Sequence, residues 1–226
     1  MLTTLLLTLV HVLVFVYWLG GDLGAFCASY YATDAHRSVA ERNLALALVN
    51  AVDTAPAVAL VLTLPSGLAL ATARGWVAWP WGYTLAVGLA SVAWLWIALR
   101  VHRRPGPPTA RLARVDHCVR VALILALAMA GAAGVLAAAG AALPFPAPPL
   151  FLALKLWLLA ACTALGLAIR QPLRAFVAAF GELARSGSTP AVETTLHASM
   201  AQCRRFVLAI WACLIAAATI GLIKPL

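Results

Sequence analysis

Apolar residues fill this chain in long continuous runs, separated by short segments that hold most of the polar residues. A helix needs about 20 mostly apolar residues to cross a hydrocarbon core of about 30 Å. The runs lack the strict alternation that marks the strands of a membrane barrel. The pattern therefore predicts an all-α bundle of six transmembrane helices. They are Leu2 to Gly20, Pro56 to Ala73 with an amphipathic lead-in from Leu44, Trp81 to Leu99, Val121 to Leu143, Leu150 to Ile169, and Phe206 to Ile223.

The composition leads to the same fold class. Hydrophobic residues make up 64% of the 226 positions and charged residues only 10%, whereas a soluble domain carries about 25% charged residues. A soluble enzyme, a disordered regulator and a secreted disulfide scaffold are excluded. We expect one transmembrane helical domain over residues 1–226, in contact with the lipid bilayer. Residues 171–203 form a longer connection, in which Thr189 and Pro190 are typical of a helix start, and short surface helices are predicted there.

The net charge of +9 would indicate nucleic-acid binding in a soluble protein. In this chain most basic residues flank the connections after the first, third and fifth helices. Because positive charge accumulates in cytoplasmic loops, this bias predicts cytoplasmic odd-numbered connections and both termini outside. We expect a multi-pass protein of the bacterial inner membrane and no nucleic-acid partner. The biased set is Arg37, Arg42, Arg100, Arg103, Arg104, Arg111, Arg114, Arg120, Arg170, Arg174, Arg185, Arg204 and Arg205, against Arg74, Lys155 and Lys224 on the other side.

Two polar residues lie well inside predicted spans, where polarity is costly. His11 is about 14 Å into the first helix. It is either a neutral imidazole bonded to a neighbouring carbonyl or hydroxyl, or a ligand of a metal or haem iron. Lys155 is about 8 Å from the outer end of the fifth helix. Its ammonium either reaches back to the interface or meets a carboxylate such as a porphyrin propionate.

Two acidic residues, Asp22 and Asp53, lie at the cytoplasmic boundary of the first two helices. Intramembrane charges generally pair with one another, so ion pairs with Arg42 or Arg120 are expected. The alternative is an entry point for a proton or a cation.

Residues with soft-metal chemistry occur near the cytoplasmic ends of the later helices. Imidazole, thioether and thiolate groups together suit an ion such as Cu(I), although an Ala-rich segment also collects such residues by chance. The five cysteines contain no CxxC pair, and structural disulfides are not expected. The candidate copper ligands are His117, Cys118, His197, Met200 and Cys203.

The first helix carries His11, then Trp18 seven residues later, then Gly20-Gly21 and Phe26. This order resembles the opening of two related groups of membrane proteins, the HemJ-type protoporphyrinogen oxidases and the CopD-type copper-resistance proteins. The Leu-rich run around Lys155 and the chain ending from Arg205 to Leu226 are similar to later HemJ helices. The resemblance implies a haem b bound through His11, with Trp18 in the binding region and Lys155 as a second ligand or propionate partner.

Three functions follow from these observations. The first is a haem b-binding membrane protein in electron transfer or porphyrin oxidation, with a porphyrin or quinone-type electron partner. The second is a copper or small-cation transporter or resistance protein of CopD type. The third is a non-catalytic membrane assembly subunit. The sequence leaves the choice between enzyme and non-enzyme open, and a homo-oligomer is compatible with each of the three.

Overall fold

The computed structural model describes residues 1–103 and 109–224, and within them the chain forms eight α-helices and no strand. The all-α prediction is confirmed. Arg104, Pro225 and Leu226, which entered the sequence arguments, lie outside the described residues. The helices are α1 (Leu2–Ala32), α2 (Val39–Val52), α3 (Thr54–Ala73), α4 (Trp81–Arg103), α5 (Ala110–Ala138), α6 (Leu150–Ala168), α7 (Arg170–Ser186) and α8 (Pro190–Ile223).

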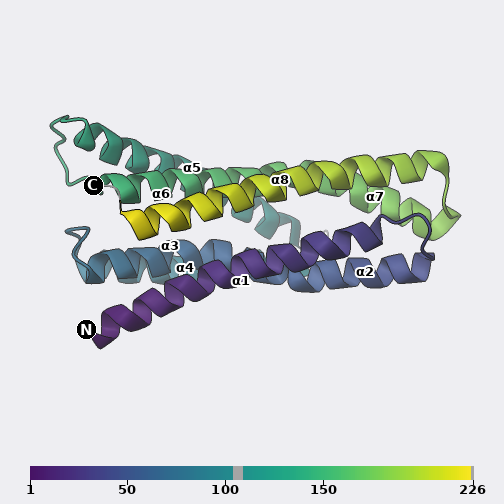
Figure 1. Cartoon of the computed structure of the whole chain (residues 1–226), viewed down its shortest axis with the longest axis horizontal. Coiled ribbons are helices and arrows are strands. Elements are labelled where there is room, and N and C mark those ends of the chain that lie inside the picture. Colours follow the sequence, from purple (N-terminus) through teal and green to yellow (C-terminus); the bar gives the residue numbers. More distant parts are fainter. Residues whose placement is uncertain (104–108, 225–226) are drawn as a thin grey trace.

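Six helical segments in the described part of the chain are long and apolar enough to cross a membrane. Four are the single helices α1, α4, α5 and α8. The other two are the pairs α2–α3 and α6–α7, each nearly continuous and interrupted at Asp53 and Ile169 respectively. The protein is therefore a multi-pass membrane protein, as the apolar runs predict. Both chain ends lie at the same end of the bundle (Figure 1), as an even number of spans requires.

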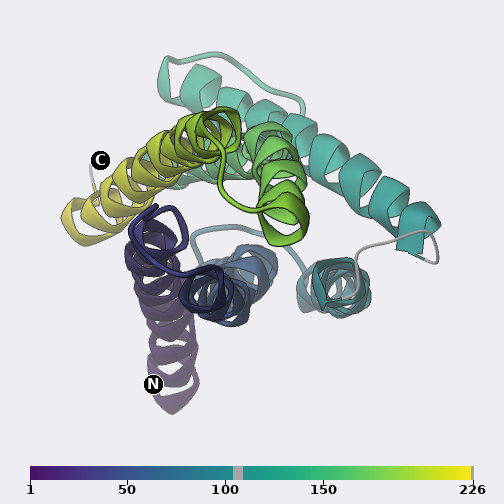
Figure 2. The same ribbon diagram turned by 90° about the vertical axis from the view of Figure 1, so that its right-hand side faces the viewer.

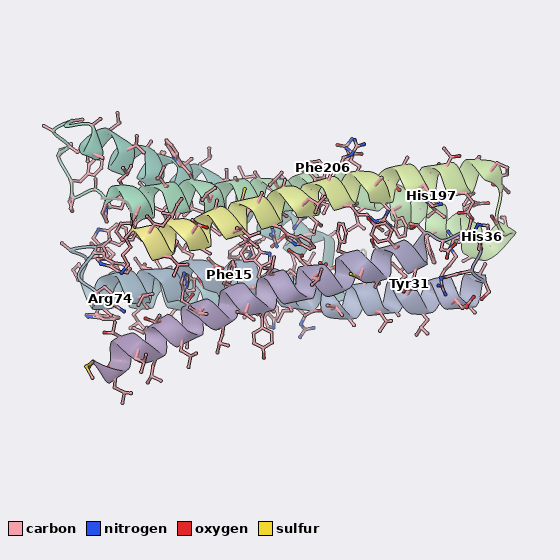
Figure 3. All side chains as sticks on the ribbon, in the orientation of Figure 1. Phe15, Tyr31, His36, Arg74, His197 and Phe206 are labelled. Carbon is pink, nitrogen blue, oxygen red and sulfur yellow. The ribbon has the colours of Figure 1, made fainter. Side chains whose placement is uncertain are left out.

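We call the end that holds both termini the terminal end, and the opposite end the arginine-rich end. Figure 3 shows Arg74 near the terminal end and His36 and His197 near the arginine-rich end. Viewed along the bundle, α1–α4 lie on one side and α5–α8 on the other (Figure 2). A main core between the two sides buries Trp18, Val61 and Leu214 together with their neighbours.

Several helices are longer than a bilayer requires. α1 has 31 residues and α8 has 34, which is about 46 and 51 Å at 1.5 Å per residue, against a hydrocarbon core of about 30 Å. At the arginine-rich end, the last turns of α1, all of α2 and α7, and the first turns of α8 pack around a second core. We call this the projecting module. Its buried residues are Ala32, Ala45, Phe176, Ala179, Phe180, Leu183, Leu196, Met200 and Cys203.

The projecting module changes the prediction for residues 171–203. α7 is an amphipathic helix nearly continuous with α6, and it buries Phe176 and Phe180 in the module. The second segment is not a short surface helix, because it is continuous with the last span as the start of α8. Thr189 caps α8 by accepting a hydrogen bond from the Val192 amide at 3.3 Å. No helix-breaking residue lies between Pro190 and the apolar run. A single helix therefore continues from the projecting module into the membrane.

Close helix contacts depend on glycines without room for a side chain. A Cβ on Gly21 of α1 would lie 2.6 Å from Cδ of Pro56 in α3. On α5, a Cβ on Gly134 would lie 2.5 Å from Cβ of Ala153 in α6. Small residues let membrane helices approach closely, and these glycines do so here. Gly20, in contrast, faces open space. Gly140, with φ +89°, follows the end of α5, so the fourth span ends earlier than the apolar run to Leu143 suggests.

Candidate functional site

His11 lies in the terminal half of α1 and contacts α3 just after Pro65, a proline inside that helix. Its Nδ1 is 2.9 Å from Oγ of Ser66. The Ser66 hydroxyl donates to the Leu62 carbonyl at 2.7 Å. A hydroxyl has one proton, and with that proton on the Leu62 carbonyl we assign Ser66 as the acceptor from Nδ1–H of His11. The neutral ring then carries its lone pair on Nε2, which has no hydrogen-bond partner among the described residues.

Gly67 allows this approach, because a Cβ there would lie 3.1 Å from Cε1 of His11. The imidazole therefore lies directly against the backbone of α3, and its orientation is defined by both Ser66 and Gly67. Of the two expectations for His11, the bond to a neighbouring hydroxyl is met at Nδ1. The metal-ligating nitrogen would be Nε2.

Lys155 of α6 is partly buried and makes no hydrogen bond or ion pair in the described part of the chain. Its Nζ points at α8, 3.0 Å from the position that a Cβ on Gly221 would occupy. Its positive charge is close enough to act on His11. The two residues singled out from the sequence therefore belong to the same electrostatic environment, between the α1–α3 and α6–α8 sides of the bundle.

Trp18 does not share that environment. It is buried in the main core two turns below His11, and its indole faces the carboxyl group of Asp22. Asp22 is itself only 7% exposed. The structure thus separates His11 from Trp18, since Trp18 belongs to a second polar site at Asp22.

The expected ion pairs of Asp22 and Asp53 with Arg42 or Arg120 are wrong. Arg42 bonds Glu193 instead, with an NH1–Oε1 distance of 2.8 Å. Arg120 bonds Asp116 instead, with an Nε–Oδ2 distance of 3.0 Å. The reason is tertiary: α2 places Arg42 in the projecting module, facing α8, whereas Arg120 lies one turn after Asp116 on α5.

Asp116 is the centre of a network that the sequence arguments missed. Its side chain is 1% exposed and receives hydrogen bonds from Arg120, Arg170 and the Trp94 indole, the last at 2.9 Å. These groups come from α4, α5 and the start of α7. Every oxygen of this buried carboxylate is matched by donors, so the network joins three helices at the arginine-rich boundary. The four-residue spacing of Asp116 and Arg120 on one helix face was the available signal.

The five candidate copper ligands do not converge. His117 and Cys118 are exposed on α5, and His197 is exposed on the projecting module. Met200 and Cys203 are buried as packing residues of that module. Across residues 1–103 and 109–224, no three His, Cys, Asp or Glu side chains are grouped so that they could hold a metal ion.

An apolar groove of about 480 Å³ lies between α3 and α4, beside the proline of α3. Its one hydroxyl, on Thr84, is hydrogen-bonded to Thr72 at 3.0 Å. The lining is almost entirely apolar, so the groove suits a hydrocarbon chain. It is lined by Pro65, Ala69, Trp81, Gly82, Thr84, Leu85 and Gly88.

Comparisons with protein-family models, with curated proteins and with solved structures found no match to this chain.

Proposed function

We propose that this protein binds haem b within the membrane, with Nε2 of His11 as an axial ligand, and that it takes part in electron transfer or porphyrin oxidation. The observation that supports the proposal is the state of His11. Its Nδ1–H is bonded to Ser66, and its Nε2 lone pair is left without a partner.

The arrangement of His11 and Ser66 suits a ligand of haem iron. A metal-ligating histidine almost always donates its other ring N–H to an oxygen, which sets the tautomer and the ring orientation. Ser66 supplies that oxygen. Haem iron takes a neutral imidazole as its axial ligand, and the polarity of the pocket then sets its potential. Bound haem would supply one-electron redox chemistry at this position.

Lys155 suits the carboxylate groups of a haem. An unpaired ammonium within a span is costly, and a haem b has two propionate carboxylates that can neutralise it. Lys155 has no carboxylate of this chain within ion-pair distance among the described residues. In the proposal it binds a propionate or serves as the second axial ligand, while His11 holds the iron.

The orientation is part of the proposal. Nearly all basic residues that the structure describes lie toward the arginine-rich end, and Arg74 and Lys224 lie at the terminal end, each over the Trp76 ring. With the positive-inside bias, this distribution supports an orientation in which the projecting module lies in the bacterial cytoplasm and the His11 site lies in the outer half of the inner membrane. The copper interpretation has no comparable support, because its candidate ligands are dispersed.

The test is an absorption spectrum of the protein purified in mild detergent, in oxidised and reduced states. We expect a Soret band in the parent and its loss in His11→Ala. Ser66→Ala removes the oxygen that orients the ring and should weaken haem binding about 10- to 100-fold. His197→Ala, an exposed histidine of α8, is the matched control and should keep full haem content. A parent without a Soret band, or an equal band in His11→Ala, would refute the proposal.

A further inference from the structure

A second polar site, centred on Asp22, is not used by the proposed haem site. Asp22 is 7% exposed, and its Oδ2 has no hydrogen-bond partner. The Nε1 of Trp211 on α8 is also buried without a partner, and the Trp211 indole faces Asp22. Buried polar groups are almost always satisfied, so an unsatisfied acceptor beside an unsatisfied donor requires an explanation.

The other buried acids of this chain show what is missing at Asp22. Asp116 is bonded by two arginines, and Glu193 is bonded by Arg42. Asp22 has no such cation. The charged group that acts on it is another acid, Asp53. In a chain with 16 basic residues, the described part leaves this carboxyl group beside a second carboxyl group.

The fold brings the two acids together by close helix packing. Gly21 and Gly24 of α1 leave no space for a Cβ, because Pro56 and Val52 lie against them. The junction between α2 and α3 is therefore pressed onto α1, and Asp53 is the residue at that junction. The Asp53 side chain is partly buried and makes no hydrogen bond or ion pair among the described residues. His102 of α4 is a titratable side chain in the surroundings of Asp53.

We propose that Asp22 and Asp53 form a proton-binding site inside the bundle. Two buried carboxyl groups that lie near one another without a cation cannot both ionise at low cost, so we expect one of them to hold a proton. The proton would neutralise Asp22 in a region where no cation among the described residues pairs with it. This site stands on its own residues and does not depend on haem binding.

The surroundings favour a proton over a metal cation. Ca²⁺, Mg²⁺ and similar hard cations need several oxygen ligands. The groups that face Asp22 besides Asp53 are the indole N–H groups of Trp18 and Trp211 and the thiol of Cys162, which has Cys213 beside it. Indole donors and neutral thiols offer no oxygen to a cation. They do suit a carboxyl group that alternates between its neutral and ionised forms.

The test is infrared spectroscopy of the full-length protein in lipid bilayers, titrated with pH. We expect a carbonyl band from a protonated carboxylic acid, which shifts in D₂O and titrates. The band should disappear in Asp22→Asn and shift in frequency in Asp22→Glu, which keeps the carboxyl group and guards against a folding defect in the first variant. Asp34→Asn, which changes an exposed acid paired with Arg37, should leave the band unchanged.

A second measurement uses dicyclohexylcarbodiimide, which modifies protonated carboxyl groups in apolar surroundings. Mass spectrometry should locate the adduct on Asp22 or Asp53 of the parent. The proposal is overturned if no titrating carbonyl band depends on Asp22, or if the adduct lies only on other acids. It is also overturned in favour of a cation site if sodium ions, at constant pH, abolish the band. None of these readouts requires haem, so failure here is distinct from failure of the haem proposal.

Discussion

The ion pair between Arg42 and Glu193 is the strongest link in the projecting module. Arg42 is 1% exposed and Glu193 is 14% exposed. The two N–O distances of their bidentate pair are 2.8 and 3.1 Å. Arg42 also donates from Nε to the Ala32 carbonyl at 3.1 Å, so one side chain joins α2, α8 and the end of α1.

The change Glu193→Gln would leave the Arg42 guanidinium buried without a counter-charge. Removing one partner of a buried pair costs about 3 to 5 kcal/mol. Glu193 is slightly open to solvent and glutamine retains one acceptor, so the lower figure of about 3 kcal/mol applies. At about 1.4 kcal/mol for each factor of ten, opening of the module becomes about 100-fold more frequent.

The assay is the labelling rate of Cys203, which is 6% exposed in the module core. The exposed Cys27 and Cys118 are first changed to serine, and mass spectrometry identifies the modified residue. When reclosing is faster than labelling, the rate follows the open population. We expect about 100-fold faster maleimide labelling of Cys203 in Glu193→Gln than in the parent.

The control is Glu182→Gln, which breaks a surface pair with Arg185 whose side chains are 45% and 73% exposed. Such pairs contribute about 0 to 1 kcal/mol, so labelling should change less than about fivefold. The double variant Arg42→Met/Glu193→Gln removes both charges and should recover part of the loss. Equal labelling rates in Glu193→Gln and Glu182→Gln would refute the reasoning.

Two further predictions concern packing and orientation. Gly131→Ala places a Cβ against Trp157 and 2.9 Å from the Ala153 carbonyl, and overpacking should lower stability by about 1 to 3 kcal/mol, seen as a lower melting temperature in detergent. Gly166→Ala on α6, where a Cβ would have nothing within 4 Å, should leave the melting temperature unchanged or raise it. For orientation, with Cys27 and Cys118 replaced by serine, a membrane-impermeant maleimide added to intact spheroplasts should label Ala141→Cys between α5 and α6, but Ala191→Cys at the start of α8 only after permeabilisation. The reverse pattern would contradict the proposed topology.

Much of the local structure follows from short-range chemistry. Ser38 and Glu41 form a capping box at the start of α2, and Thr189 with Pro190 begins α8, both recognisable as letters in the sequence. The apolar runs predict the spans, because the bilayer imposes a length and a composition on each one. The extension of α1 beyond Gly20 and the continuity of α8 from Pro190 into the last span were not predicted, because hydropathy does not show whether a helix continues beyond the membrane.

Some residues of the candidate sites are recognisable from the sequence, and others are not. His11 and Lys155 are recognisable from the sequence, because a polar group inside an apolar run is rare. Their partners are not, since Ser66 lies 55 residues from His11 and Arg42 lies 151 residues from Glu193. The wrong ion pairs for Asp22 and Asp53 came from matching charges by their position along the membrane normal, without knowledge of helix rotation.

The sequence by itself determined an all-α membrane protein with six spans, because hydrophobic length and composition are properties of each segment alone. Only the tertiary structure decided which polar groups meet. Rotation and contact of the helices set the tautomer of His11 through Ser66, gave Asp116 its arginines, and left Asp22 beside Asp53. These pairings depend on close contacts at glycines and on which face each helix turns toward segments distant in the sequence.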